Sequence, residues 1–141
     1  MSPHVTPELL HLAYRSDLEI LIGRWGYQPQ PTALPAEYER LTAAALAHGA
    51  YRWLQDIRRR TLNDPATTQW LLTEYFPNMA QQLGARLRVA YLVSPTLYQH
   101  IIAEPGYVPA EAYTGQPFAL AFFGEEGPAV DWLRQAEPGA N

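Results

Sequence analysis

Residues 51–95 read YRWLQDIRRRTLNDPATTQWLLTEYFPNMAQQLGARLRVAYLVSP and largely decide the fold expected for this chain. Segment 87–93 is a near-continuous apolar run, as in strands that are buried on both faces of a parallel sheet, and we interpret segment 52–57 as the strand before it. Between them, Asp64-Pro65 is a typical helix start, because the carboxylate accepts from free first-turn amides and proline needs no donor there. The stretch therefore predicts a strand, a crossover helix and a second, parallel strand.

The helix predicted to follow Asp64 extends to Gly84 and contains an interruption. Its apolar face repeats at helical spacing and comprises Trp70, Leu72, Tyr75, Phe76, Met79 and Leu83. Pro77 lies inside this segment and lacks the amide that would donate to the carbonyl of Thr73. We therefore expect a kink or a break at Pro77.

The alternation of strand and helix extends in both directions. Upstream, the sequence predicts a hairpin of strands 11–15 and 18–25 around Ser16-Asp17, then a helix over 35–48 that Gly49 ends. Downstream, it predicts a short helix over 95–102, a strand over 118–123 and a closing helix over 128–136 that Pro138-Gly139 ends. Together these elements predict a single α/β domain: a mixed, mostly parallel sheet with an N-terminal β-hairpin and flanking helices, its core spanning about residues 9–136.

The composition narrows the classes of function. The 141 residues include no cysteine, and all ten basic residues are arginine, which excludes disulfides, thiolate zinc sites and lysine Schiff bases. A net charge of -4 has the wrong sign for a phosphate-backbone binder, so we expect no nucleic-acid partner. Residues 1–8 lack a basic export signal, and no apolar run approaches the roughly 20 residues of a membrane span, so we expect a cytoplasmic protein.

Three segments carry a resemblance to a known family. The first is the stretch FFGEEGPAVDWL at 122–133. The other two, RWLQD at 52–56 and AYLVSP at 90–95, contain the predicted middle strands. With the order of elements, they resemble the STAS-like domains that are often called SpoIIAA-like, and among them uncharacterised bacterial proteins. The resemblance implies a sheet whose first strand is antiparallel and a regulatory role exerted through protein contacts.

One position departs from the pattern of that family. Members that act as anti-anti-sigma factors carry a phosphorylated serine directly after an aspartate at the start of the second helix. Here the matching pair is Asp64-Pro65, and proline has no hydroxyl to phosphorylate. We therefore expect no phosphoserine switch, and we interpret Thr67 and Thr68 as ordinary first-turn residues.

Polar residues cluster where the predicted parallel strands end. Ligands of open parallel sheets gather beyond the carboxyl ends of the strands. The candidate anion or ligand site there comprises Asp56, Arg58, Arg59, Arg60, Asp64, Ser94 and Thr96, beside the turn at 124–127. Arginine forks and the amides of two helix starts could hold an anion. The alternative is that Asp64 and Ser94 cap their helices while the arginines form a solvated strand end paired with Asp56.

No catalytic or metal constellation emerges from the sequence. Ser94, His100 and Asp56 are the only nucleophile, base and acid that can be assembled, and Ser94 is already needed as a helix cap. The histidines at positions 4, 11, 48 and 100 form no ligand pair at metal spacing. We therefore expect neither an enzyme, nor a metal site, nor a cofactor.

The segment 103–117 is the other unusual feature. Loops of this length are uncommon in compact domains and are often lids or binding loops. Tyr107 and Tyr113 lie here among prolines and glycines that favour one shape, and they either cover a pocket, face a partner or plug the sheet edge.

Two hypotheses of function follow. The first is a non-enzymatic regulatory domain that binds another protein or a second copy of itself, which a charged fraction of only 17% favours. The alternative is a carrier or sensor of a small lipid-like or anionic ligand with 103–117 as a lid, because SEC14-type lipid-binding domains share a related arrangement.

Overall fold

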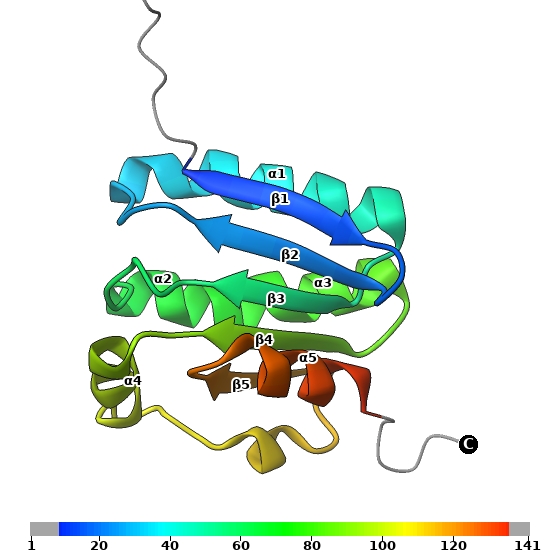
Figure 1. Ribbon diagram of the computed structural model, residues 1–141. Coiled ribbons are helices and arrows are strands. Elements are labelled where there is room, and N and C mark those ends of the chain that lie inside the picture. Colours follow the sequence, from blue (N-terminus) through cyan, green and yellow to red (C-terminus); the bar gives the residue numbers. More distant parts are fainter. Residues whose placement is uncertain (1–8, 136–141) are drawn as a thin grey trace, which may run out of the picture.

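The computed structural model describes residues 9–135 and has one five-stranded sheet whose strands lie in chain order. The strands are β1 (Leu10–Arg15), β2 (Ile20–Trp25), β3 (Arg52–Asp56), β4 (Leu87–Leu92) and β5 (Phe118–Phe123). β1 is antiparallel to β2, and every following pair is parallel (Figure 1). The predicted α/β fold with a mixed, mostly parallel sheet and an N-terminal hairpin is therefore confirmed.

Helices cover both faces of the sheet unequally. The helical elements are η1 (Pro31–Ala33), α1 (Leu34–His48), α2 (Pro65–Trp70), η2 (Leu71–Tyr75), α3 (Phe76–Leu83), α4 (Pro95–Ile102), η3 (Ala110–Tyr113) and α5 (Glu126–Arg134). Crossovers between parallel neighbours are almost always right-handed. Because β2 to β5 follow one another in chain order, the helices that connect them fall on the same face of the sheet. Figure 1 shows this arrangement, with α1 and α3 behind the sheet and α5 in front.

Each face of the sheet has its own apolar core. The larger core joins β-strand residues such as Trp53 and Val89 to Leu41 of α1 and to Phe76 and Met79 of the second helical segment. The smaller core lies under α5, which buries Ala129 and Leu133 among branched and small residues of the strands. The buried aromatic side chains thus belong to the larger core, whereas Phe123 and Trp132 are partly buried against the smaller one.

The helical segment after Asp64 passes through Pro77 without ending. Residues 71–75 form a single π-helical turn, η2, and α3 begins directly after it, so that Pro77 is a first-turn residue of α3. An amide is dispensable in a first turn. Of the expected kink or break at Pro77, the break does not occur: the helical segment continues, and the wider turn directly before it interrupts the regular α-helix and absorbs the lost hydrogen bond.

Two elements, β2 and α5, begin two residues away from their predicted starts. β2 begins at Ile20, two residues later than predicted, because residues 16–19 form the turn and Glu19 has a positive φ of 57°. α5 begins at Glu126, ahead of Pro128. The segment 103–117 contains the short helix η3, and the expected end of the closing helix at 136–139 lies outside the described residues.

The longest helix of the described range, α1, has 15 residues. None of the helices within 9–135 combines the length and the apolar character that a bilayer crossing requires.

Candidate functional site

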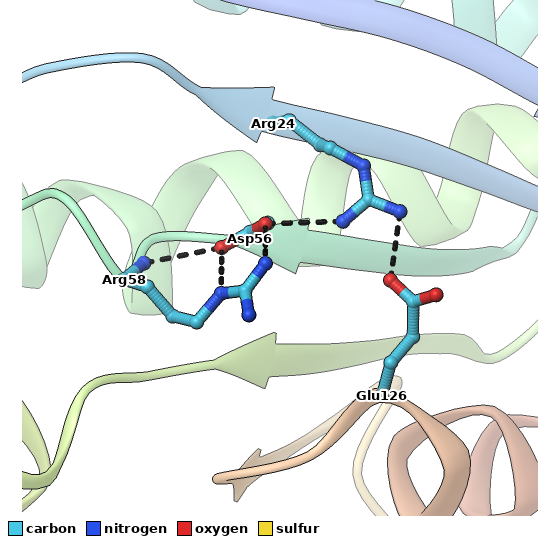
Figure 2. Close-up of polar contacts among 4 residues, drawn as sticks. All are labelled: Arg24, Asp56, Arg58 and Glu126. Carbon is cyan, nitrogen blue, oxygen red and sulfur yellow. Dashed lines mark hydrogen bonds and ion pairs between the residues drawn. The ribbon is translucent and has the colours of Figure 1, made fainter.

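Asp56 at the end of β3 is the centre of a four-residue ion-pair cluster on the α5 face. Its carboxylate accepts from Arg58 Nε and Nη2 at 3.0 and 2.7 Å and from Arg24 Nη1 at 3.0 Å. Arg24 also donates from Nη2 to Glu126 Oε1 at 2.7 Å, which joins β2 to the start of α5 (Figure 2). The cluster contains two arginines and two carboxylates, so it carries no net charge.

The charges of this cluster set the pKa of Asp56. Burial raises the pKa of the Asp56 carboxyl, but the hydrogen bonds from Arg58 and Arg24 outweigh it, and the net pKa is below the ordinary value. The Arg58 side chain is 51% exposed, and the Arg24 side chain is 39% exposed. The cluster therefore functions as a latch that joins β2, β3 and α5, with its carboxylate ionised at neutral pH.

Asp56→Asn is expected to lower the free energy of unfolding by about 1–3 kcal/mol at pH 7, because hydrogen bonds from charged donors are lost. A carboxyl whose folded pKa is lowered stabilises the fold above its ordinary pKa, and that contribution is lost as the pH falls through the folded pKa. The difference between the variant and the wild type should therefore be constant from neutral pH down to about pH 5 and shrink below about pH 4. Urea unfolding at a series of pH values measures it.

Asp131→Asn is the matched control for Asp56→Asn. Asp131 is an exposed carboxylate on α5 outside the ion-pair cluster, so its replacement should leave stability within about 0.5 kcal/mol of the wild type. Equal losses in the two variants, or a difference for Asp56→Asn that grows in acid, would contradict the latch.

The remaining members of the predicted anion site do not come together. Asp64 caps α2 by accepting from the amide and hydroxyl of Thr67, and Ser94 caps α4 by accepting from the amide of Leu97. Thr96 and Arg59 are exposed. Arg60 lies apart from Arg58, buried on the opposite face of the sheet. Asp64 and Ser94 thus act as helix caps. Of the three arginines, Arg58 belongs to the latch, Arg59 is solvated and Arg60 is buried.

A cavity of about 450 Å³ lies on the face of the sheet that carries α1 and α3. Strands β3 to β5 provide its floor through Trp53, Gln55, Tyr91 and Leu120. Its walls come from the helical segment 65–76 and from α4, and the segment 104–113 forms its rim. This volume and its mostly apolar lining are typical of sites for small molecules, which range over about 300–1,000 Å³.

Both tyrosines of the predicted lid line this cavity. Tyr107 packs its ring 6.2 Å from that of Phe122, and Tyr113 packs 5.5 Å from Phe118, so both fold back on β5. The backbone carbonyl of Tyr113 also accepts from Arg86, which ties η3 to the sheet. The two tyrosines therefore pack against the edge strand β5 and line the cavity at the same time.

Two polar side chains are buried in the cavity lining. Arg60 is 7% exposed, stacks its guanidinium 4.5 Å from the centre of the Trp25 ring and donates from Nη2 to Asn63. Gln55 is 4% exposed and accepts from the Trp25 indole N–H at 2.9 Å. Within residues 9–135, Arg60 Nε and Gln55 Nε2 have no hydrogen-bond partner. Buried donors of this kind are costly unless something accepts from them.

Gln55 and Trp25 were absent from the sequence-based site. The sequence signal that could have identified Gln55 is a glutamine within a predicted buried strand, because a buried amide must find hydrogen-bond partners. Gly23 on the neighbouring strand makes room for it, since a Cβ there would lie 2.8 Å from Gln55 Nε2. Trp25 is a buried core residue, and its indole also orients Gln55.

Residues 9–135 contain no group of three histidine, aspartate or glutamate side chains arranged to hold a metal ion. Of the residues considered for a hydrolytic triad, Ser94 caps α4, Asp56 belongs to the latch and His100 is exposed in the last turn of α4.

No protein-family model matches the chain, and no curated protein matches it either. A fold of this kind supports many functions, so the function is argued from the site itself. The fold and the site define the chain as a single-domain α/β protein with a mostly apolar cavity on one face of its sheet.

Proposed function

We propose that this protein binds a small, largely apolar molecule in the cavity between the sheet and the segment 104–113. The observation that carries the proposal is the cavity itself, whose lining is apolar apart from a few buried or rim polar groups. A chain of this size has enough apolar residues to fill its interior, and close packing is the norm for protein cores. A preformed space of this volume is therefore best interpreted as a binding site.

The arrangement of the rim supports a carrier or sensor with a lid. Tyr107 and Tyr113 stand over the cavity on a segment anchored at both ends, by α4 and by β5. Movement of such a segment would admit a ligand without disturbing the sheet. We propose no catalytic step, because the polar groups in the lining are hydrogen-bond donors and acceptors rather than a nucleophile beside a base.

We also propose the STAS-like relationship and a cytoplasmic, bacterial setting for this protein. The antiparallel first strand and the chain-order sheet support the family. Partner binding or self-association is compatible with ligand binding and finds support in the exposed apolar side chains of Tyr27 and Trp70. Ligand binding is the better supported of the two functions, since it rests on a defined site.

Leu72→Trp is expected to weaken the binding of a neutral apolar fluorophore, N-phenyl-1-naphthylamine, by about tenfold or more. Leu72 is half-buried in the cavity wall on η2, so a larger side chain there narrows the space. The probe brightens in apolar surroundings, and a fluorescence titration gives its dissociation constant.

Leu46→Trp is the matched control, because Leu46 is 43% exposed on α1 and does not line the cavity. It should bind the probe as the wild type does. Failure of the wild type to bind the probe, or equal weakening in both variants, would overturn the cavity as the binding site.

A further inference from the structure

We propose that the natural ligand of this cavity carries one carboxylate head, held by Arg60 beside Trp25 and Gln55, on an apolar body. The inference rests on the proposed function and names the class of ligand for the same site.

The first step is the charge of Arg60. Its side chain is buried, lines the cavity and has no ion-pair partner among the described residues. Its contacts include the amide of Asn63, the phenol of Tyr38 and the face of the Trp25 indole, all of them uncharged. Buried charges are normally paired, because removal from water is expensive. A ligand anion would supply the missing charge.

The second step is the orientation of Gln55. An indole N–H can only donate, so the atom of Gln55 that it contacts is the carbonyl oxygen. The other end of the side chain is therefore the NH₂ group, a donor that has no partner within residues 9–135. The Trp25 contact thus fixes the amide of Gln55, with its NH₂ group buried over Gly23 beside the cavity wall.

The third step is the convergence of these groups on Trp25. Gln55 hydrogen-bonds to its indole nitrogen, Arg60 stacks on its ring, and the Tyr38 ring packs 5.9 Å from it. Burial raises the pKa of the Tyr38 phenol, and the nearby positive charge of Arg60 partly offsets that effect. A guanidinium, an amide N–H and a phenol therefore share one wall of the cavity.

The fourth step distinguishes a carboxylate from a phosphate. One buried guanidinium balances one negative charge, whereas a phosphate ester group carries nearly two at neutral pH. Glu104 also lines the cavity, but it is exposed two residues after α4, where it would repel a second anionic group at the rim. Most of the remaining lining is aromatic or aliphatic, which fits an apolar body, and Thr68, Gln69 and Thr73 add polar groups on the helical wall. A singly charged, planar head is the best match for a planar fork.

Calorimetric titration with two matched probes tests the inference. 1-Naphthaleneacetate carries the carboxylate, and 2-(1-naphthyl)ethanol has a similar body with a neutral hydroxyl. The wild type should bind the carboxylate at least about tenfold more tightly than the alcohol, because charge-assisted hydrogen bonds form only with the former. Inorganic phosphate alone should show no heat of binding.

Arg60→Met should abolish this preference and leave the affinity for the alcohol within about twofold of the wild type. Arg58→Met is the matched control, since Arg58 belongs to the latch on the other face, and it should keep the full preference. Without added ligand, Arg60→Met should unfold at a urea concentration no lower than the wild type, because methionine removes a buried unpaired charge. A merely structural Arg60 would lower that midpoint.

Equal affinity of the wild type for the two probes would overturn the carboxylate inference and leave the cavity as a binding site. Preference retained in Arg60→Met, or phosphate binding that Arg60→Met removes, would also overturn it. If N-phenyl-1-naphthylamine and both naphthyl probes fail to bind, the proposed function itself fails. The wild-type comparison decides the matter even if Arg60→Met does not fold.

Discussion

Trp53→Ala is expected to lower the free energy of unfolding by about 3–5 kcal/mol, the largest single effect predicted for this protein. Trp53 is fully buried in the middle of β3, with ring centres 6.3 Å from Tyr75 and 6.4 Å from Phe76. Its indole N–H donates to the carbonyl of Ala50 at 2.8 Å, so alanine also leaves a buried acceptor unpaired. The loss is a large fraction of the roughly 5–15 kcal/mol that stabilises a typical domain.

Urea unfolding followed by circular dichroism measures this loss, and Trp70→Ala is its matched control. Trp70 is the same side chain at 37% exposure on α2, where it touches Tyr38 and Tyr75 from the edge of the core. Its replacement should cost less than about half as much, because less apolar area returns to water. Equal losses would show that Trp53 does not anchor the larger core.

Leu133→Ala is the second prediction of large effect, with an expected loss of about 2–5 kcal/mol. Leu133 is fully buried in the smaller core, together with Ala129 and the strand residues Ile20, Leu54 and Leu92. In the described part of the chain, α5 provides the helical cover of this core, so few neighbouring side chains can move into the space that a smaller residue leaves.

Leu46→Ala is the control for Leu133→Ala in the same urea unfolding experiment. Leu46 lies in a helix as well, but it is 43% exposed, so its truncation should cost no more than about 1 kcal/mol. A loss below that value for Leu133→Ala would mean that α5 packs loosely and that the smaller core contributes little.

The sequence predicted the strands and most helices because local signals and buried periodicity agree at those positions. Segment 87–93 is almost continuously apolar, and caps such as Asp64 and Ser94 act as expected. At Pro77 the sequence predicted a kink or a break without distinguishing them, because a lost hydrogen bond can end a helix or widen a turn, and tertiary packing selects between the two.

The cavity could be predicted only in outline. Tyr107 and Tyr113 suggested a lid, but the empty volume depends on how α4, η2 and 104–113 pack, which no local pattern encodes. The run Arg58 to Arg60 read as one basic cluster, whereas the turn after β3 sends Arg58 to the latch and Arg60 to the opposite face. Gln55 could not be assigned a role before Trp25 was known to lie opposite it.

The most direct test of the proposed ligand site is an NMR titration that observes the four tryptophan indole N–H groups as N-phenyl-1-naphthylamine is added. Trp25 and Trp53 line the cavity, whereas Trp132 on α5 packs against Phe123 and Arg88 on the other face. The indole signals of Trp25 and Trp53 should shift in a saturable way while that of Trp132 stays in place. A titration that leaves Trp25 and Trp53 unmoved, or that shifts Trp132 alone, would contradict a ligand site in this cavity.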